Sequence, residues 1–144
     1  MKRVGMLILA GVSLLLIVSL GNSFAEPPVA AAKIARGKYL VEGVGKCGDC
    51  HSPMNEKGEP IPGKELRGAT LTFKPTVPMP IWADKAPNIA GLRGWEQEDA
   101  VKFLMTGIAY NDLPARPPMP QYRLNKADAE AVVAYLKSLS ATAK

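Results

Sequence analysis

Cys47-Gly48-Asp49-Cys50-His51 is the stretch of sequence that decides the fold of this chain. Two thiols that are separated by two residues and followed at once by a histidine form the pattern through which haem is bonded covalently to a protein. The two-residue gap lets both sulfurs reach one macrocycle, and the imidazole of His51 then lies beneath the iron. We therefore predict that Cys47 and Cys50 bind haem c and that His51 is an axial ligand.

Two other interpretations of the cysteines are weaker. A thioredoxin-like dithiol belongs at a strand-to-helix junction in a βαβ unit, whereas the residues before Cys47 have a helical pattern. A structural zinc site generally needs four Cys or His ligands, and this chain has three such residues in total. Because the motif occurs once and His51 is the only histidine, one haem is predicted, with a second axial ligand that is not histidine.

Methionine is the predicted second ligand, because Met/His ligation is the electron-transfer arrangement that raises the potential of a haem. Four of the six methionines are set aside, since they lie at the N-terminus, directly after the motif or in an apolar helical stripe: Met1, Met6, Met54 and Met105. Met79 and Met119 remain, both in proline-rich segments. We favour Met119, because residues 87–108 must build part of the pocket wall before the chain crosses the haem.

The N-terminus has the pattern of an export signal. Two basic residues at positions 2 and 3 precede an apolar stretch, Val4 to Leu20, and small residues precede a cleavage site after Ala25. We expect residues 1–25 to be a cleaved signal peptide and the protein to be periplasmic. The alternative is an uncleaved anchor that tethers the protein to the inner membrane, since the stretch approaches the roughly 17 to 20 apolar residues that span a bilayer.

Length and charge restrict the remaining function classes. The chain has 144 residues, which fits one domain. Removing Lys2 and Arg3 with the signal leaves 16 basic against 13 acidic residues, a net charge of +3. This mild excess is not the basic footprint of a nucleic-acid-binding protein, so no nucleic-acid partner is predicted.

Apolar residues at helical spacing predict three helices. The first covers Lys33 to about Lys46, and the second covers Gln97–Thr106 and stops at a glycine. A third helix follows the capping residue Asn125. The buried stripe of the first helix is expected to contain Ile34, Leu40, Val41 and Val44. Residues 26–32 contain two prolines and are expected to be a linker, so the folded domain is expected to span residues 33–144.

Proline and glycine interrupt the chain between these helices. Residues 52–86 and 108–123 contain too many of them for a long helix. Leu71 and Phe73 alternate with polar residues, so a short strand or hairpin is expected there. The predicted fold is all-α, with a few helices wrapped around one covalently bound haem and connected by long loops rich in proline and glycine.

The haem motif, the segment APNIAG (residues 86–91), the segment PPMPQY (residues 117–122) and the helical YLKSL (residues 135–139) together resemble the mono-haem class I cytochromes c. The resemblance covers Lys33 to about Ser140 and implies a cytochrome c-like domain. It also implies that the backbone carbonyl of Pro87 orients His51, and that Gly37 packs against Tyr135 where the first and last helices cross.

The 35 residues from Ser52 to Ala86 are more than the small members of that family have at this place. This segment resembles the loop of dehydrogenase-associated cytochrome modules, which usually come in threes within one chain. The resemblance implies redox partner proteins without naming the donor or the acceptor. It implies a one-electron carrier and not an enzyme. The alternative is a haem enzyme or small-gas sensor with an open sixth coordination position, which would need a distal acid-base group other than histidine.

Overall fold

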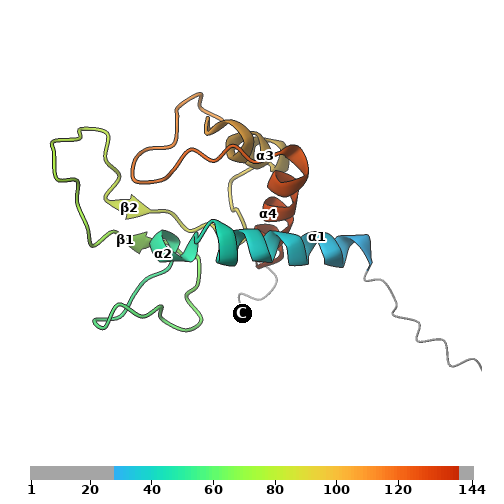
Figure 1. The fold of residues 1–144 in the computed structure, drawn as a ribbon, viewed down its shortest axis with the longest axis horizontal. Helices are drawn as coiled ribbons and strands as arrows, with labels where there is room; N and C mark the ends of the chain where they lie inside the picture. Colours follow the sequence, from blue (N-terminus) through green and yellow to red (C-terminus); the bar gives the residue numbers. More distant parts are fainter. Residues whose placement is uncertain (1–27, 140–144) are drawn as a thin grey trace, which may run out of the picture.

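The computed structural model of the protein describes residues 28–139. Helices, a π-helical segment and two short strands are connected by long loops (Figure 1). In chain order the elements are α1 (Val29–Lys38), η1 (Tyr39–Val44), α2 (Gly48–His51), β1 (Ala69–Thr70), β2 (Lys85–Ala86), α3 (Gln97–Thr106) and α4 (Lys126–Ser138). The expected signal peptide lies outside the described residues. The prediction of an all-α fold with long loops is confirmed.

The first helix begins earlier than the sequence pattern indicated. It starts at Val29, directly after Pro28, whose carbonyl accepts hydrogen bonds from the amides of Ala31 and Ala32. Proline is compatible with the start of a helix, and the alanines that follow have the highest helix propensity. Residues 29–32, which were expected to belong to the linker, therefore form the first turn of α1.

The π-helical segment η1 continues α1 toward the haem motif. Its wider turns are visible in the hydrogen bond from the Gly45 amide to the Leu40 carbonyl, five residues back, with an N···O distance of 2.7 Å. Leu40 and Val41 are buried, but Val44 is 59% exposed. The expectation that Val44 completes the buried stripe was wrong. The expected stripe was based on an α-helix with 3.6 residues per turn, whereas a π-helix has more residues per turn.

Helices α1 and α4 cross at close range (Figure 1). Gly37 is buried at the crossing, and a Cβ atom placed on it would lie 1.9 Å from the Ala131 carbonyl oxygen and 2.8 Å from the Tyr135 Cβ. Only glycine permits this approach, since any side chain would overlap the facing backbone. The predicted contact between Gly37 and Tyr135 is confirmed, with Ala131 the nearest residue.

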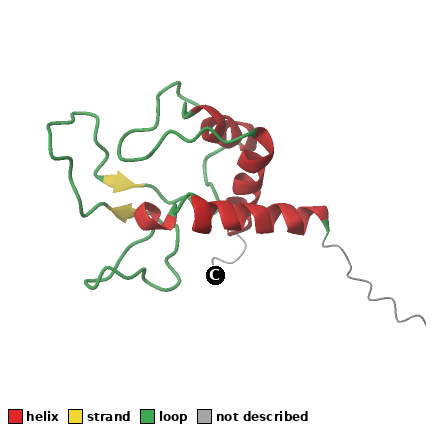
Figure 2. Ribbon diagram, viewed as in Figure 1, coloured by secondary structure: helices red, strands yellow, loops and turns green. Residues whose placement is uncertain are grey.

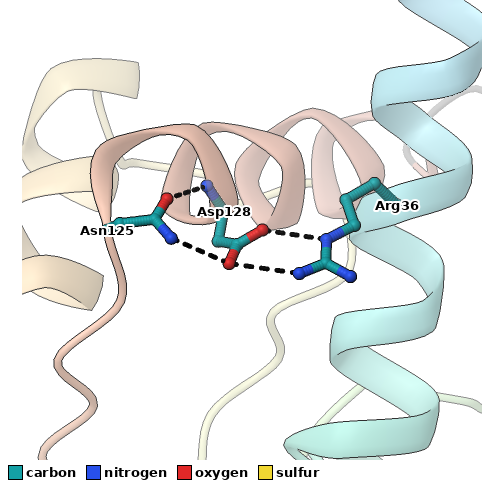
Figure 3. Close-up of polar contacts among 3 residues, drawn as sticks. All are labelled: Arg36, Asn125 and Asp128. Atoms are coloured by element: carbon teal, nitrogen blue, oxygen red, sulfur yellow. Dashed lines mark hydrogen bonds and ion pairs between the residues drawn. The ribbon is translucent and has the colours of Figure 1, made fainter.

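A polar contact joins the same two helices near the start of α4 (Figure 3). The Asn125 side chain caps α4 by accepting a hydrogen bond from the Asp128 amide, at 2.9 Å, as predicted for this residue. Its amide group also donates to the Asp128 carboxylate, at 3.1 Å. That carboxylate receives two hydrogen bonds from the Arg36 guanidinium, at 2.9 and 3.2 Å. The cap thus orients the carboxylate that α1 binds.

Two apolar clusters share α4 as their common element. One cluster packs α4 against η1 and the loop residue Leu66, and the other packs it against α3. Helix α3 ends at Gly107, whose φ of 75° is the left-handed conformation expected for a glycine stop. Among residues 28–139, no helix combines the length and apolar character that a membrane span requires.

The loops and the small sheet lie to one side of the helices (Figure 2). Strand β1 pairs with β2 in antiparallel register, with Ala69 opposite Ala86. The sheet lies just before the expected position near Leu71, whose amide extends the pairing to the Asp84 carbonyl at 2.9 Å. This pairing brings the chain that follows α2 next to Pro87.

Candidate cofactor site

The haem motif forms a single helical turn. Cys47 is the N-cap of α2, and Cys50 and His51 follow in that turn. Residues three and four positions apart lie on the same side of a helix, so Cys47 lies on the same side as Cys50 and as His51. Local helical geometry therefore explains why two residues separate the cysteines.

The orientation of His51 is fixed by one hydrogen bond. Its ring is buried, and its Nδ1 lies 2.8 Å from the carbonyl oxygen of Pro87. A carbonyl only accepts, so Nδ1 carries the proton and Nε2 keeps the free lone pair that a metal ligand needs. Burial lowers the pKa of His51, although the bond to Pro87 opposes this shift, so the neutral form is favoured.

Gly68 holds the Pro87 segment close to α2, a role that the sequence did not reveal. Its amide donates to the His51 carbonyl at 2.7 Å, and its φ of 87° is one that side-chain-bearing residues rarely adopt. A Cβ atom here would lie 2.8 Å from the Asn88 amide nitrogen and 3.0 Å from the Pro87 carbonyl carbon. Gly68 therefore allows the two segments to approach closely. In the sequence it was only one of several loop glycines.

One cavity, of about 270 Å³, is lined by His51, Pro87 and Met119 together. Met119 is half-buried, whereas Met79 is 39% exposed and is not part of this lining. The structure thus brings Met119 to the cavity that contains His51. Whether its sulfur binds iron stays a prediction.

The two thiols lie beside this cavity and do not line it. Both are half-buried, and they are not joined in a disulfide. Burial raises the pKa of the Cys47 thiol, and the nearby Asp49 carboxylate acts in the same direction. The thiol form is therefore favoured at neutral pH in the chain without an attached group. Among the described residues, no group of three or more Cys, His, Asp or Glu side chains is arranged to hold a metal ion.

The residues around the cavity fit a haem. Its walls include the apolar side chains of Leu71, Trp95, Phe103 and Leu113, as a largely apolar macrocycle requires. Trp82 is not itself a lining residue but precedes the lining residue Ala83, and its indole nitrogen is buried without a hydrogen-bond partner within residues 28–139. An unpaired buried donor costs roughly 1 to 3 kcal/mol, and a bound group with acceptor oxygens is one way to remove that cost.

Comparison with known proteins places the chain among haem proteins. A family model for cytochrome c matches residues 34–140. The fructose dehydrogenase cytochrome subunit of Gluconobacter japonicus is 33% identical over 120 residues, which make up 76% of this chain and 22% of that protein. The gluconate 2-dehydrogenase cytochrome c subunit of Pantoea cypripedii is also 33% identical, over 81% of this chain and 27% of that protein.

A third relative is the diheme cytochrome c-type protein of Cereibacter sphaeroides. It is 32% identical over 112 residues, which make up 74% of this chain and 35% of the relative. The aligned part of the chain therefore spans between about a fifth and about a third of the length of these three relatives. The similarity covers one cytochrome-sized part of each of these longer proteins.

Proposed function

The chain belongs to the cytochrome c family, and on that basis we propose that it is a periplasmic mono-haem carrier of single electrons. A cytochrome c domain implies covalently bound haem c, for which Cys47 and Cys50 are the attachment residues. When bound, the haem supplies an iron that alternates between the ferric and ferrous states. The domain that holds it begins with α1 at Val29, four residues before the expected start at residue 33, and residues 1–25 are the export signal.

The observation that carries this proposal is that His51 and Met119 line the same cavity. His51 presents Nε2 because its Nδ1–H donates a hydrogen bond to the Pro87 carbonyl. Met119 contributes a thioether from the segment between α3 and α4, far along the chain from His51. If both side chains held the iron, no substrate would reach the metal, and the chain would shield the ring and tune its potential.

The proposed partners are other redox proteins. Two of the relatives described above are named as cytochrome subunits of sugar-oxidising or sugar-acid-oxidising dehydrogenases, which supports a dehydrogenase as the upstream partner. The lining of the cavity includes Lys85 and Arg116, so the charge near the site is positive and favours an acidic partner surface. Such electron-transfer contacts are small and brief.

The test is the optical spectrum of the protein after export with the haem-attachment machinery. We expect the weak near-infrared band of ferric iron–methionine ligation and no binding of carbon monoxide by the reduced wild-type protein. Met119→Ala should keep the haem attached, lose the band and bind carbon monoxide. Met79→Ala is the matched control, because it removes the other candidate methionine and should leave both readouts unchanged.

Two results would contradict the proposal in different ways. If Met79→Ala loses the band and Met119→Ala keeps it, the second ligand is Met79 and the carrier function stands. If the wild-type protein lacks the band and binds carbon monoxide, the sixth position is open, and the chain is a haem enzyme or a gas sensor instead.

A further inference from the structure

Tyr122 connects two parts of the candidate site that are far apart in the sequence. Its hydroxyl donates a hydrogen bond to the Gly45 carbonyl oxygen at 2.9 Å, across 77 residues of chain. Tyr122 comes three residues after Met119, and Gly45 comes two residues before Cys47. This one bond therefore joins the methionine segment to the segment that carries the attachment cysteines.

The carbonyl that accepts this bond lies at a helix end. Gly45 is the C-cap of η1, and the last carbonyls of a helix have no partner in a following turn. The Tyr122 hydroxyl supplies a donor there. Because Tyr122 is half-buried, the bond is partly protected from competition by water and is stronger than an exposed one.

The Tyr122 hydroxyl also lies in the immediate surroundings of the attachment site. A Cβ atom placed on Gly45 would lie 3.3 Å from the Cys47 sulfur and 3.5 Å from the Tyr122 hydroxyl oxygen. Burial raises the pKa of Tyr122, and negative charge at Cys47 or Cys50 would raise it further. The hydroxyl thus stays protonated and available as a donor at all ordinary pH values.

The segment between Met119 and α4 makes hydrogen bonds to other elements at Tyr122 and at Leu124, and its Gln121 and Arg123 side chains lie close to Gly107. Residues 120–125 form no helix or strand, and Gln121 and Arg123 are exposed on either side of Tyr122. At its far end, the Leu124 amide donates to the Leu104 carbonyl at 3.2 Å. Tyr122 is therefore the first residue after Met119 whose hydrogen bond reaches another element of the fold.

We propose that Tyr122 is a positioning residue that holds the Met119 sulfur over the cofactor by tying its segment to Gly45. This inference rests on the proposed role of Met119 as an iron ligand. The hydroxyl bond slows excursions of the segment, and the methionine sulfur would leave the iron more readily when the segment moves away from η1. Removing the bond increases the fraction of time for which the sixth position is open.

The test is Tyr122→Phe, which removes the hydroxyl and keeps the ring. Ferric wild-type and variant holoproteins are mixed with imidazole, and the loss of the near-infrared methionine band is followed in time. We expect the binding rate to rise about three- to tenfold in the variant, as the loss of one hydrogen bond of ordinary strength predicts. The apparent dissociation constant for imidazole should fall by a similar factor.

Tyr135→Phe is the matched control. The Tyr135 hydroxyl also joins distant parts of the chain, since it donates to the Glu42 carboxylate from α4. Removing the Tyr135 hydroxyl also lowers the stability of the fold. Tyr135, however, lies sixteen residues from Met119 in the sequence and belongs to the crossing of α1 with α4. We expect Tyr135→Phe to lower the melting temperature and to leave the imidazole rate at the wild-type value.

The outcomes separate this inference from the proposed function. An unchanged imidazole rate in Tyr122→Phe, or an equal rise in both tyrosine variants, would overturn the positioning role while the methionine band of the wild type still supports the electron carrier. Absence of that band from the wild type, or its persistence in Met119→Ala, would instead contradict the role of Met119 itself.

Discussion

At the scale of single residues, the absence of a side chain at Gly37 decides how closely the first and last helices approach. The Ala131 carbonyl occupies the space where a Cβ atom would be. Neither backbone can move away without disturbing buried neighbours, because Ala131 and Tyr135 both belong to the buried face of α4. Gly37 therefore has a steric role that outweighs the usual cost of glycine in a helix.

We predict that Gly37→Ala lowers the free energy of unfolding by about 1 to 3 kcal/mol, the usual cost of overpacking. Gly43→Ala is the control, since a Cβ atom there would meet only the Tyr39 ring, at 3.3 to 3.4 Å, on an exposed surface. Denaturant unfolding of the two holoproteins, followed by circular dichroism, measures the difference. Equal stability of the two variants would show that the helices can separate at little cost.

Residues whose roles depend on near neighbours were predictable from the sequence. The helix stop at Gly107 and the cap at Asn125 both follow from local chemistry. The roles of Gly68 and Tyr122 were not predictable, because each depends on a segment that is distant in the sequence. Pro87 was recognised only through the resemblance to a family, since its carbonyl carries no sequence signal.

At the scale of elements, charged contacts supplement the apolar packing between α1 and α4. Lys33 binds Glu130 at 2.7 Å, and Arg36 binds Asp128. The Arg36 hydrogen bonds hold the pKa of the Asp128 carboxyl below its ordinary value. The unfolded chain therefore takes up a proton at a higher pH than the folded chain, so this contact stabilises the fold above the unfolded pKa and is lost as the pH falls through the folded one.

We predict that Asp128→Asn lowers the melting temperature at neutral pH, and that its difference from the wild type shrinks as the pH falls below about 4, near the ordinary pKa of aspartate. The difference disappears once the pH has fallen below the lowered pKa of the folded protein, where the wild-type carboxyl is also protonated and its charged contact with Arg36 is lost. Melting curves from pH 7 to about 2 test this. Glu56→Gln, in the exposed loop after α2, is the control that should show no such convergence. A constant difference across the series would mean that the charge of Asp128 contributes nothing.

The sequence predicted α3 and the start of α4 correctly but placed both ends of the first helix wrongly. The bounds of α3 and the cap of α4 agree with the periodicity, because both helices are regular and end at strong local signals. The first helix differs at both ends. Its alanine-rich start extends the helix to Val29, and the change to π geometry in η1 turns Val44 outward.

At the scale of the whole molecule, the buried core is small relative to the length of the loops. Its two apolar clusters lie around the helices, and the segments 52–68, 71–84 and 108–124 contain no helix and no strand. The second and third of these segments contribute residues to the lining of the cavity of His51 and Met119. A bound haem would supply apolar surface that these loops do not find among themselves, and so would add its binding energy to stability.

We predict that Cys47→Ser/Cys50→Ser, which cannot attach haem covalently, gives a chain without a cooperative thermal transition and with little near-ultraviolet circular dichroism. Met119→Ala is the control, because it keeps both attachment thiols and should still unfold cooperatively. A sharp transition in the double variant would show that the helices alone specify the fold.

The crossing of α1 with α4 also has a consequence for the order of events during biosynthesis. The hydrogen bond between Lys33 and Glu130 spans 97 residues, so α4 cannot pack against α1 until Glu130 has emerged from the ribosome. Contacts of this separation form late. Cys47 and Cys50 emerge well before α4, and during that interval they belong to an open, unfolded segment. An enzyme that attached a prosthetic group to these thiols in that interval would therefore act on an unfolded segment. The packing of α1 against α4 would follow attachment.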